Sequence, residues 1–281
     1  MLTKTFFAPA KINLCLHILG RLSNGYHELA MAMQRVDLCD TVHIRLGGKV
    51  GIRVRCSGVD LPEGEENIAA KAARVLLDAA GIDVGVDIEI EKQIPVAAGL
   101  GGGSSDAATV LLGLNEMLGK KISMEQLLAL GGGLGTDVPF FVFQQPAWAT
   151  GTGTKLEPLS PLPEVAYLLI NPGIAVSTAD VYRSLQLTKG GDLANLPRFS
   201  VVSKIDLCAA LHNDLESVTL QQFPVIGEIK QRLLDQGALG ALMSGSGATV
   251  FGVYPDFTTA SKAGEKLAVE NDWLVCPVHP V

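Results

Sequence analysis

Charged side chains are scarce in this sequence. Only 18% of its 281 residues are Asp, Glu, Lys or Arg, and acidic residues outnumber basic ones by 29 to 22. Because the chain has no basic run that could follow a phosphate backbone, we expect no nucleic acid as a partner. Any anionic ligand must therefore be held locally, by backbone amides, a helix N-terminus, a single lysine or a metal ion.

Long apolar runs are also missing. The longest uncharged stretch, 236–255, is broken by five glycines and two serines, which predicts a strand, a turn and a strand instead of a membrane span. The apolar stretch before Lys11 is too short for an export signal. The five cysteines form an odd set without short spacings, which is typical of reduced thiols. We therefore expect a cytoplasmic protein that has no membrane partner.

Apolar residues and glycine are plentiful. The hydrophobic share of 48% suffices for a core without disulfide bonds, and the chain has 31 glycines. Strand-like and helix-like apolar periods both occur along the chain, which predicts an α+β protein. Because three prolines follow closely after residue 157, we assign residues 1–155 to an N-terminal lobe and 156–281 to a C-terminal lobe.

Local signals place the individual elements. Alternating apolar residues predict strands over residues 11–18, 31–38, 41–46, 51–56, 86–91, 165–171 and 273–278. Capping residues predict helices from Asn67 to Gly81, after Ser104 or Ser105, after the capping-box pair Ser123 and Gln126, and over residues 258–268. We find no internal repeat.

Lys11 and Asn13 fall on the same face of the first predicted strand, because side chains alternate across a strand with a period of two. The apolar Ile12 and Leu14 point the other way, toward a core. On periodicity alone, a polar face that merely meets water explains the pattern as well as a functional face does. The spacing establishes only that Lys11 and Asn13 share a face.

A glycine-rich segment between a predicted strand and a predicted helix is the central feature. Glycines let the backbone approach a ligand closely, and a helix N-terminus supplies unbonded N–H groups and the positive end of a dipole. Together they predict a phosphate cradle, with a flexible hinge as the alternative. The segment comprises Pro95, Val96, Ala97, Ala98, Gly99, Leu100, Gly101, Gly102, Gly103, Ser104 and Ser105.

Three common phosphate-binding patterns do not fit this segment. The P-loop requires a lysine that is absent here, and the third glycine of the dinucleotide-binding pattern would fall on Ser104. A protein-kinase interpretation also fails, since the chain has no H-R-D or D-F-G set. The phosphate chemistry must therefore belong to another class.

The glycine-rich segment resembles the second motif of the GHMP kinases, the family of galactokinase, homoserine kinase and mevalonate kinase. Segments 9–14 and 242–248 resemble the first and last motifs of that family, in the same order, so the resemblance spans nearly the whole chain. It implies ATP as co-substrate. It also implies an N-terminal lobe with a left-handed β-α-β element, like a ribosomal-protein domain, and a ferredoxin-like C-terminal lobe.

Segments 25–29 and 135–141 resemble one branch of this family, whose acceptor carries a cytidine diphosphate group and belongs to the non-mevalonate route to isoprenoid precursors. By motif position, the resemblance implies that Asp137 takes the proton of the acceptor hydroxyl. It implies that Lys11 orients Asp137 and offsets charge near the transferred phosphoryl group. Phosphoryl transfer depends on positioning and charge stabilisation, so a carboxylate, a cation and an amide cradle suffice.

The resemblance also assigns residues to the acceptor. Asn13 is expected to bond the substrate or to hold Lys11. Tyr26 and His27 match cytidine-binding positions, where a ring stacks on the pyrimidine and an imidazole bonds its edge. Tyr182 matches the position of a second stacking ring.

For the nucleotide, Lys92 and Asn67 match positions that contact adenine in the family. Mg²⁺ is implied as well, and Ser105 is the one ligand that can be assigned by motif. Met33 departs from the pattern, because related enzymes can carry an aromatic residue there. One wall of the cytidine pocket therefore has no assigned residue.

Two other functions stay open: another GHMP small-molecule kinase, of the homoserine or mevalonate type, and a nucleotide-binding sensor without activity. Tyr26 and His27, together with segment 135–137, argue against the first. The joint presence of Lys11 and Asp137 argues against the second. We expect a monomer or a weak homodimer. The histidines outside the motifs have no ligand spacing and are expected to be structural or exposed: His17, His43, His212 and His279. Segment 212–216 is expected to be a helix joint.

Overall fold

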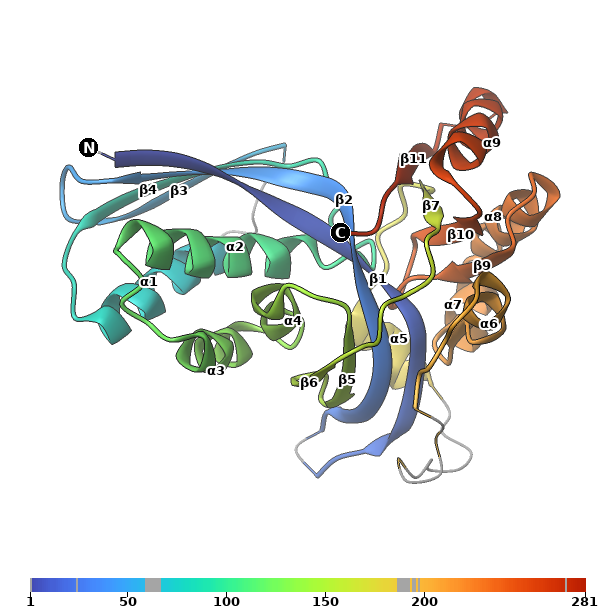
Figure 1. Cartoon of the computed structure of the whole chain (residues 1–281), viewed down its shortest axis with the longest axis horizontal. Coiled ribbons are helices and arrows are strands. Elements are labelled where there is room, and N and C mark those ends of the chain that lie inside the picture. Colours follow the sequence, from blue (N-terminus) through green and yellow to red (C-terminus); the bar gives the residue numbers. More distant parts are fainter. Residues whose placement is uncertain are drawn as a thin grey trace. The chain divides into compact units, whose positions relative to one another are not determined.

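A computed structural model of the chain describes residues 2–23, 25–58, 67–185, 193, 196, 198–270 and 272–281 (Figure 1). The strands are β1 Leu2–Arg21, β2 His27–Leu46, β3 Gly51–Ser57, β4 Gly85–Glu91, β5 Ala147–Gly151, β6 Lys155–Pro158, β7 Ala166–Asn171, β8 His212–Asn213, β9 Gly240–Met243, β10 Val250–Tyr254 and β11 Leu274–Val278. The helices are α1 Ile68–Ala80, α2 Gly102–Met117, α3 Met124–Leu134, α4 Val138–Phe143, α5 Thr178–Ser184, α6 Lys204–Ala209, α7 Glu216–Gln222, α8 Pro224–Asp235 and α9 Phe257–Glu270.

The two long first strands organise the larger sheet. Its strand order is β3-β4-β2-β1-β8, with β5 paired to β2 and β6 paired to β5. β2 is continuous where the sequence predicted two strands. β2 runs through Asp40, whose buried carboxylate accepts the backbone N–H groups of Gln93 and Ile94, just after β4.

Strands β3 and β4 run parallel, with α1 between them in the chain, which is the β-α-β arrangement expected of the N-terminal lobe. α1 has the predicted ends: Asn67 Oδ1 accepts the N–H of Ala69, and Gly81 closes the helix with a left-handed backbone. The capping box of Ser123 and Gln126 is confirmed at α3. α1 packs on α2, and α2 packs on α3 and α4 (Figure 1).

One predicted helix cap is wrong. α2 begins at Gly102, so Ser104 and Ser105 lie inside its first turns and not before them. The N-cap is Gly101, whose φ of 71° lies in the left-handed region that glycine adopts without strain. The glycines therefore start the helix, and both serine side chains are available for other contacts.

The smaller sheet has the strand order β11-β7-β10-β9, and all of its neighbours are antiparallel. α8 precedes β9 and packs on β9 and β10, while α9 connects β10 to β11 and packs on β7 and β11. The element order strand, helix, strand, strand, helix, strand with this sheet order is ferredoxin-like. Every residue of β7 and β10 is buried, so this sheet forms the core of the C-terminal part.

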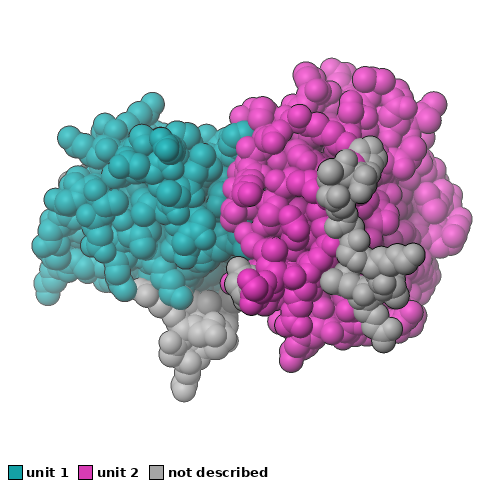
Figure 2. Space-filling view, turned by 90° about the horizontal axis from the view of Figure 1, so that it is seen from below, with its two compact units in different colours: residues 1–10, 38–94, 101–144 teal, residues 11–37, 95–100, 145–281 magenta. Residues whose placement is uncertain are grey.

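Two compact units are assembled from interleaved segments (Figure 2). Unit 1 contains residues 1–10, 38–94 and 101–144, and unit 2 contains residues 11–37, 95–100 and 145–281. β1, β2 and the glycine-rich segment each contribute residues to both units. The lobe division at residues 155 and 156 stays a prediction. Within the described part of the chain, no helix combines the length and the apolar character needed to cross a membrane.

Candidate active site

The polar face of β1 is buried in unit 2. Lys11 is 4% exposed and Asn13 is 1% exposed, and Cys15 on the same face is buried too. The alternative in which this face meets water is therefore wrong. Since burying an ammonium group costs several kcal/mol unless it is bonded, Lys11 must be held by specific partners.

Three sequence motifs meet around Lys11 in unit 2. Lys11 Nζ donates to Asn13 Oδ1 at 2.6 Å, and the Lys11 backbone N–H donates to Leu100 O in the glycine-rich segment. The Asn13 backbone N–H donates to Ser244 Oγ at 3.3 Å, and this hydroxyl donates to Gly99 O at 3.0 Å. The first motif, the start of the second and the last motif are thus joined by hydrogen bonds.

Two glycines make this close approach possible. Gly99 has φ +78°, and a Cβ there would lie 2.0 Å from Ser244 O, so any side chain would force the two backbones apart. At Gly245, which has φ +56°, a Cβ would lie 3.4 Å from Lys11 Nζ. The last motif therefore brings its backbone next to the Lys11 ammonium group.

Backbone bonds anchor the loop 95–100 to the rest of unit 2. Ala98 O accepts the N–H of Thr249, and Ala97 O accepts the N–H of Val176. Ala98 is buried, whereas Val96 is 59% exposed. The loop is therefore held at defined points, unlike a hinge.

Asn213 supports the last motif and was missed by the sequence analysis. Its Nδ2 donates to Met243 O and Gly245 O, each at 2.8 Å, and its Oδ1 accepts the N–H of Leu215. Segment 212–216 leads from α6 into α7, as expected of a helix joint, and its first two residues also form β8, which pairs parallel with β1. The adjacent pair of Asn213 and Asp214 is the sequence signal that could have indicated a hydrogen-bonded turn.

His27 and Tyr182, both expected at the cytidine group, lie together in unit 2. Their rings stack, with centroids 4.8 Å apart and an interplanar angle of 29°. Burial and the nearby Arg21 lower the pKa of His27, so its ring is neutral at pH 7. Tyr26 is 58% exposed, whereas Met33 is 1% exposed and belongs to the core.

In unit 1, the start of α2 offers unused polar groups. Its N-cap makes no side-chain cap hydrogen bond to the first N–H groups, and the first turn contains no acidic residue. Ser105 is fully buried, and its Oγ has no hydrogen-bond partner among the described residues. The positive end of the helix dipole and these donors suit an anionic ligand.

Lys92 is clamped between two carboxylates beside this helix start. Its Nζ donates to Asp106 Oδ2 at 2.8 Å and to Asp40 Oδ2, while Asp40 Oδ1 accepts the backbone N–H groups of Gln93 and Ile94. Burial raises the pKa of Asp106 to about 7, against the opposing effect of Lys92. Burial lowers the pKa of Lys92, but the two carboxylates outweigh it and raise that pKa overall.

Asp40 and Asp106 were not predicted as site residues. Asp40 is the more informative of the two, because its carboxylate holds both Lys92 and the backbone that leads from β4 into the glycine-rich segment. An acid that stands between apolar residues in a strand-like segment is a sequence signal for such a role. The pattern of Leu38, Cys39 and Val42 around it carried that signal.

The loop before Asp137 lies beside the first turns of α1 and α2, all in unit 1. A Cβ on Gly135 would lie 3.8 Å from both Ser104 Oγ and Ile68 Cδ1. Ile68 directly follows Asn67, so the Asn67 cap is near this loop. Asp137 precedes α4, and its side chain makes no capping hydrogen bond to that helix. Unit 1 thus gathers Asn67, the start of α2 and the Asp137 loop.

Comparisons with known proteins identify the family of the chain. Residues 67–145 match the N-terminal domain of the GHMP kinases, and residues 195–271 match the C-terminal domain of the same family. The chain belongs to the GHMP kinase family. Its expected α+β fold is therefore confirmed.

Individual proteins of known name are similar to this chain. The chain is 58% identical over 278 residues to the 4-diphosphocytidyl-2-C-methyl-D-erythritol kinase of Syntrophotalea carbinolica, covering 99% of each chain. A crystal structure of 4-(cytidine 5'-diphospho)-2C-methyl-D-erythritol kinase matches with a TM-score of 0.80 and 36% identity, over 98% of this chain and 99% of that one. Homoserine kinase from Cytophaga hutchinsonii matches with a TM-score of 0.76 over 99% and 95% of the two chains, but at 21% identity it shows the fold alone.

Proposed function

We propose that the protein transfers the γ-phosphoryl group of ATP to the 2-hydroxyl group of 4-diphosphocytidyl-2-C-methyl-D-erythritol, a step in the non-mevalonate route to isoprenoid precursors. The name of the relative that is 58% identical over nearly the full chain supports this substrate. The observation that carries the proposal is the meeting of the three motifs around the buried Lys11. None of the five cysteines forms a disulfide bond, which suits the reducing cytoplasm that we propose as the location. We also propose that the protein is a monomer or a weak homodimer.

Residues 95–105 bind the phosphates of ATP in this proposal. The uncapped start of α2 supplies N–H donors, so the backbone holds the charge that the acidic chain cannot offset with basic side chains. Asn67 and Lys92 lie at the adenine end. The ion pairs with Asp40 and Asp106 keep the Lys92 ammonium group in one place, which favours a role in positioning the adenine ring.

Asp137 acts as the base and Lys11 stabilises charge. The acceptor 2-hydroxyl oxygen bonds to the γ-phosphorus, the bond from that phosphorus to the β–γ bridging oxygen breaks, and the hydroxyl proton passes to the Asp137 carboxylate. ADP leaves with the bridging oxygen. The Lys11 ammonium group, oriented by Asn13, stabilises the negative charge on the transferred group.

Mg²⁺ fits the start of α2 by its donor chemistry. Ser105 Oγ is a buried oxygen without a hydrogen-bond partner among the described residues, and magnesium prefers oxygen ligands. Ser105 would therefore hold the ion together with ATP oxygens and water. When bound, the ion supplies positive charge that offsets the phosphate oxygens.

The cytidine group is assigned to Tyr26, His27 and Tyr182. The observed stack of His27 on Tyr182 shows that these two rings reach each other from distant parts of the chain, and the exposed Tyr26 ring adds a second surface for stacking. The neutral His27 ring can both donate and accept a hydrogen bond at the pyrimidine edge.

A coupled ADP-release assay tests the function directly. We expect ATP-dependent turnover with 4-diphosphocytidyl-2-C-methyl-D-erythritol and none above background with homoserine or mevalonate. Turnover with either of the latter would favour another GHMP kinase function. ATP binding without turnover on any of the three would favour a sensor.

Asp137→Asn tests the base. It should lower the phosphoryl-transfer rate by about two to four orders of magnitude and leave ATP binding intact, because only the proton acceptor is lost. Turnover gives the first quantity and ATP titration gives the second. Asp83→Asn, an exposed acid in the same unit, is the matched control. Near-normal turnover of Asp137→Asn removes Asp137 from this role.

His27→Ala tests the cytidine pocket. Loss of the stacked ring should raise the KM for the cytidine substrate roughly tenfold or more, with unchanged affinity for ATP. His43→Ala, a half-buried histidine in unit 1, is the control. An equal loss of affinity for both ligands would show that the pockets are wrongly assigned.

A further inference from the structure

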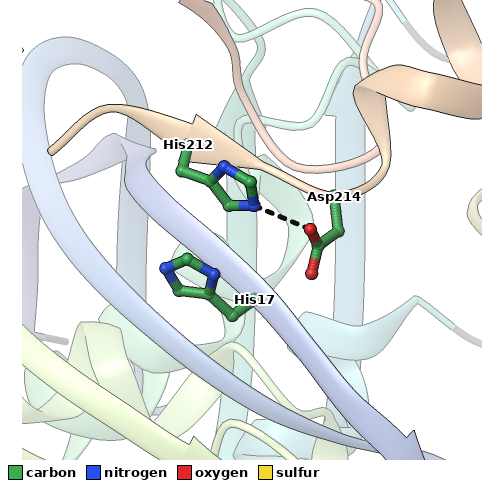
Figure 3. Close-up of side chains that lie close together, drawn as sticks. All are labelled: His17, His212 and Asp214. Atoms are coloured by element: carbon green, nitrogen blue, oxygen red, sulfur yellow. Dashed lines mark hydrogen bonds and ion pairs between the residues drawn. The ribbon is translucent and has the colours of Figure 1, made fainter. Parts of the chain in front are cut away.

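Two histidines and an aspartate outside the proposed kinase chemistry converge in unit 2 (Figure 3). His17 lies on β1, His212 lies on β8, and Asp214 directly follows β8. One ligand atom from each residue lies within 4.8 Å of the others. In sequence, His17 is far from the other two, so no ligand spacing was visible there.

The parallel pairing of β1 with β8 produces this cluster. Cys15 is the register partner of His212, and alternate residues of a strand point to one face, so His17 comes next to Asp214. Two bonds fasten the pair: Asp214 N–H donates to Leu16 O at 3.1 Å, and Ile18 N–H donates to Asp214 Oδ2 at 2.7 Å. The cluster therefore rests on backbone geometry.

The three side chains also contact one another. His17 and His212 stack with ring centroids 4.4 Å apart, and His212 Nε2–H donates to Asp214 Oδ1 at 2.7 Å (Figure 3). The side chains of His212 and Asp214 are 48% and 33% exposed, so an ion from solvent can reach them. Cys15 is no ligand, because burial raises the pKa of its thiol to about 12.

We propose that His17, His212 and Asp214 form a binding site for one zinc ion, with water as the fourth ligand. Two imidazole nitrogens and one carboxylate oxygen are a ligand set that Zn²⁺ takes in tetrahedral sites that keep a water position. Bonds of about 2.0–2.1 Å put ligand atoms roughly 3.4 Å apart, so each side chain moves by about 1 Å. One imidazole turns out of the stack so that its lone pair points at the ion.

Protons and zinc compete for this cluster. Burial and the neighbouring His212 lower the pKa of His17, so this ring is neutral at pH 7 and ready to bind. The hydrogen bond to Asp214 raises the pKa of His212, with a contribution from Glu216, and zinc must displace that Nε2 proton. Binding is therefore expected to weaken steeply as the pH falls from 7.5 to 5.5.

The location gives the ion a defined effect. Zinc would join β1 to the segment whose Asn213 holds Met243 O and Gly245 O of the last glycine motif. It binds the folded chain only, since β1 and β8 separate on unfolding, and so it raises the midpoint of thermal unfolding. This inference does not depend on the identity of the kinase substrate.

Zinc titration of the full chain without a histidine tag tests the site. We expect saturable one-to-one binding of Zn²⁺ by calorimetry at pH 7.5 and a rise in Tm with zinc concentration. His17→Gln and Asp214→Asn should each weaken the binding by more than about tenfold, because each removes a direct ligand. His43→Gln is the matched control, since His43 lies outside the cluster, with its Nε2 3.5 Å from Glu91 Oε1.

Each result decides the matter. Equal zinc affinity in wild type, His17→Gln and Asp214→Asn, or no saturable binding by the wild type, would overturn the proposal. If His17→Gln does not fold, the wild type carries the test alone, since unchanged binding at pH 5.5 would exclude histidine ligands. Kinase turnover is not a readout of this experiment, so the proposed function and the zinc site fail or stand separately.

Discussion

Each compact unit buries one lysine of the candidate site, and different chemistry holds the two. In unit 2, Lys11 donates to the neutral amide of Asn13, whereas in unit 1 Lys92 donates to the carboxylates of Asp40 and Asp106. The amide oxygen of Asn13 sets the direction of the Lys11 ammonium group, whereas the two carboxylates beside Lys92 fix its ammonium group and offset its charge. The comparison suggests that the Lys11 pair aims a cation at a ligand and that the Lys92 cluster fastens unit 1.

The largest expected effect is on turnover at Lys11. Lys11→Met should lower the phosphoryl-transfer rate by about two to three orders of magnitude, because a fixed positive charge near the transferred group is lost. Steady-state ADP release measures it. Lys155→Met, an exposed lysine of unit 2, is the control and should keep normal turnover. A Lys11→Met protein that turns over normally would break the comparison on this side.

Lys92→Met should lower the stability of the folded protein, in addition to any effect on adenine binding. The change leaves the buried carboxylates of Asp40 and Asp106 without their cation, which costs about 3 kcal/mol in free energy of unfolding. Urea unfolding measures it, with the exposed Lys71→Met on α1 as the control. If Lys92→Met and Lys71→Met lose equal stability, the Lys92 cluster does not stabilise unit 1.

Asp106→Asn sharpens the comparison through pH. The pKa of Asp106 is raised from 3.8 to about 7. Between these two pH values, Asp106 is therefore protonated in the folded chain and ionised in the unfolded chain. Stability from this group is therefore present at low pH and lost as the pH rises through about 7. Relative to wild type, Asp106→Asn should gain stability from pH 4 to pH 8, by about 4 kcal/mol. Urea midpoints at several pH values measure it, and a constant difference would contradict the assignment.

Local signals predicted much of the fold. Asn67 and Gly81 end α1 as expected, because a side-chain cap and a left-handed glycine act within a few residues of the helix. The cap of α2 was predicted wrongly for the same reason. Serine is a good cap in isolation, but the left-handed Gly101 started the helix before Ser104 was reached.

Some residues of the candidate site could be predicted from the sequence and others could not. Lys11 and Asn13 were predicted to share a face, and the glycine segment was predicted to lead into a helix; the structure has both features. Asp40 and Asn213 were missed because their hydrogen-bond partners are distant in the sequence. Lys92 is 52 residues from Asp40, and Gly245 is 32 residues from Asn213. A periodicity records which side a residue faces and does not record what it meets there.

The sequence by itself determined the strand and helix periods, the glycine-rich motifs and the family they resemble, since these depend on residues close together in the chain. Only the tertiary structure decided that the polar face of β1 is buried, that Lys92 lies between two carboxylates, and that His17 meets His212 and Asp214. The physical reason is that strand pairing joins segments that are distant in sequence. Several of the few charged side chains in this sequence are therefore buried in the structure, where specific partners hold them.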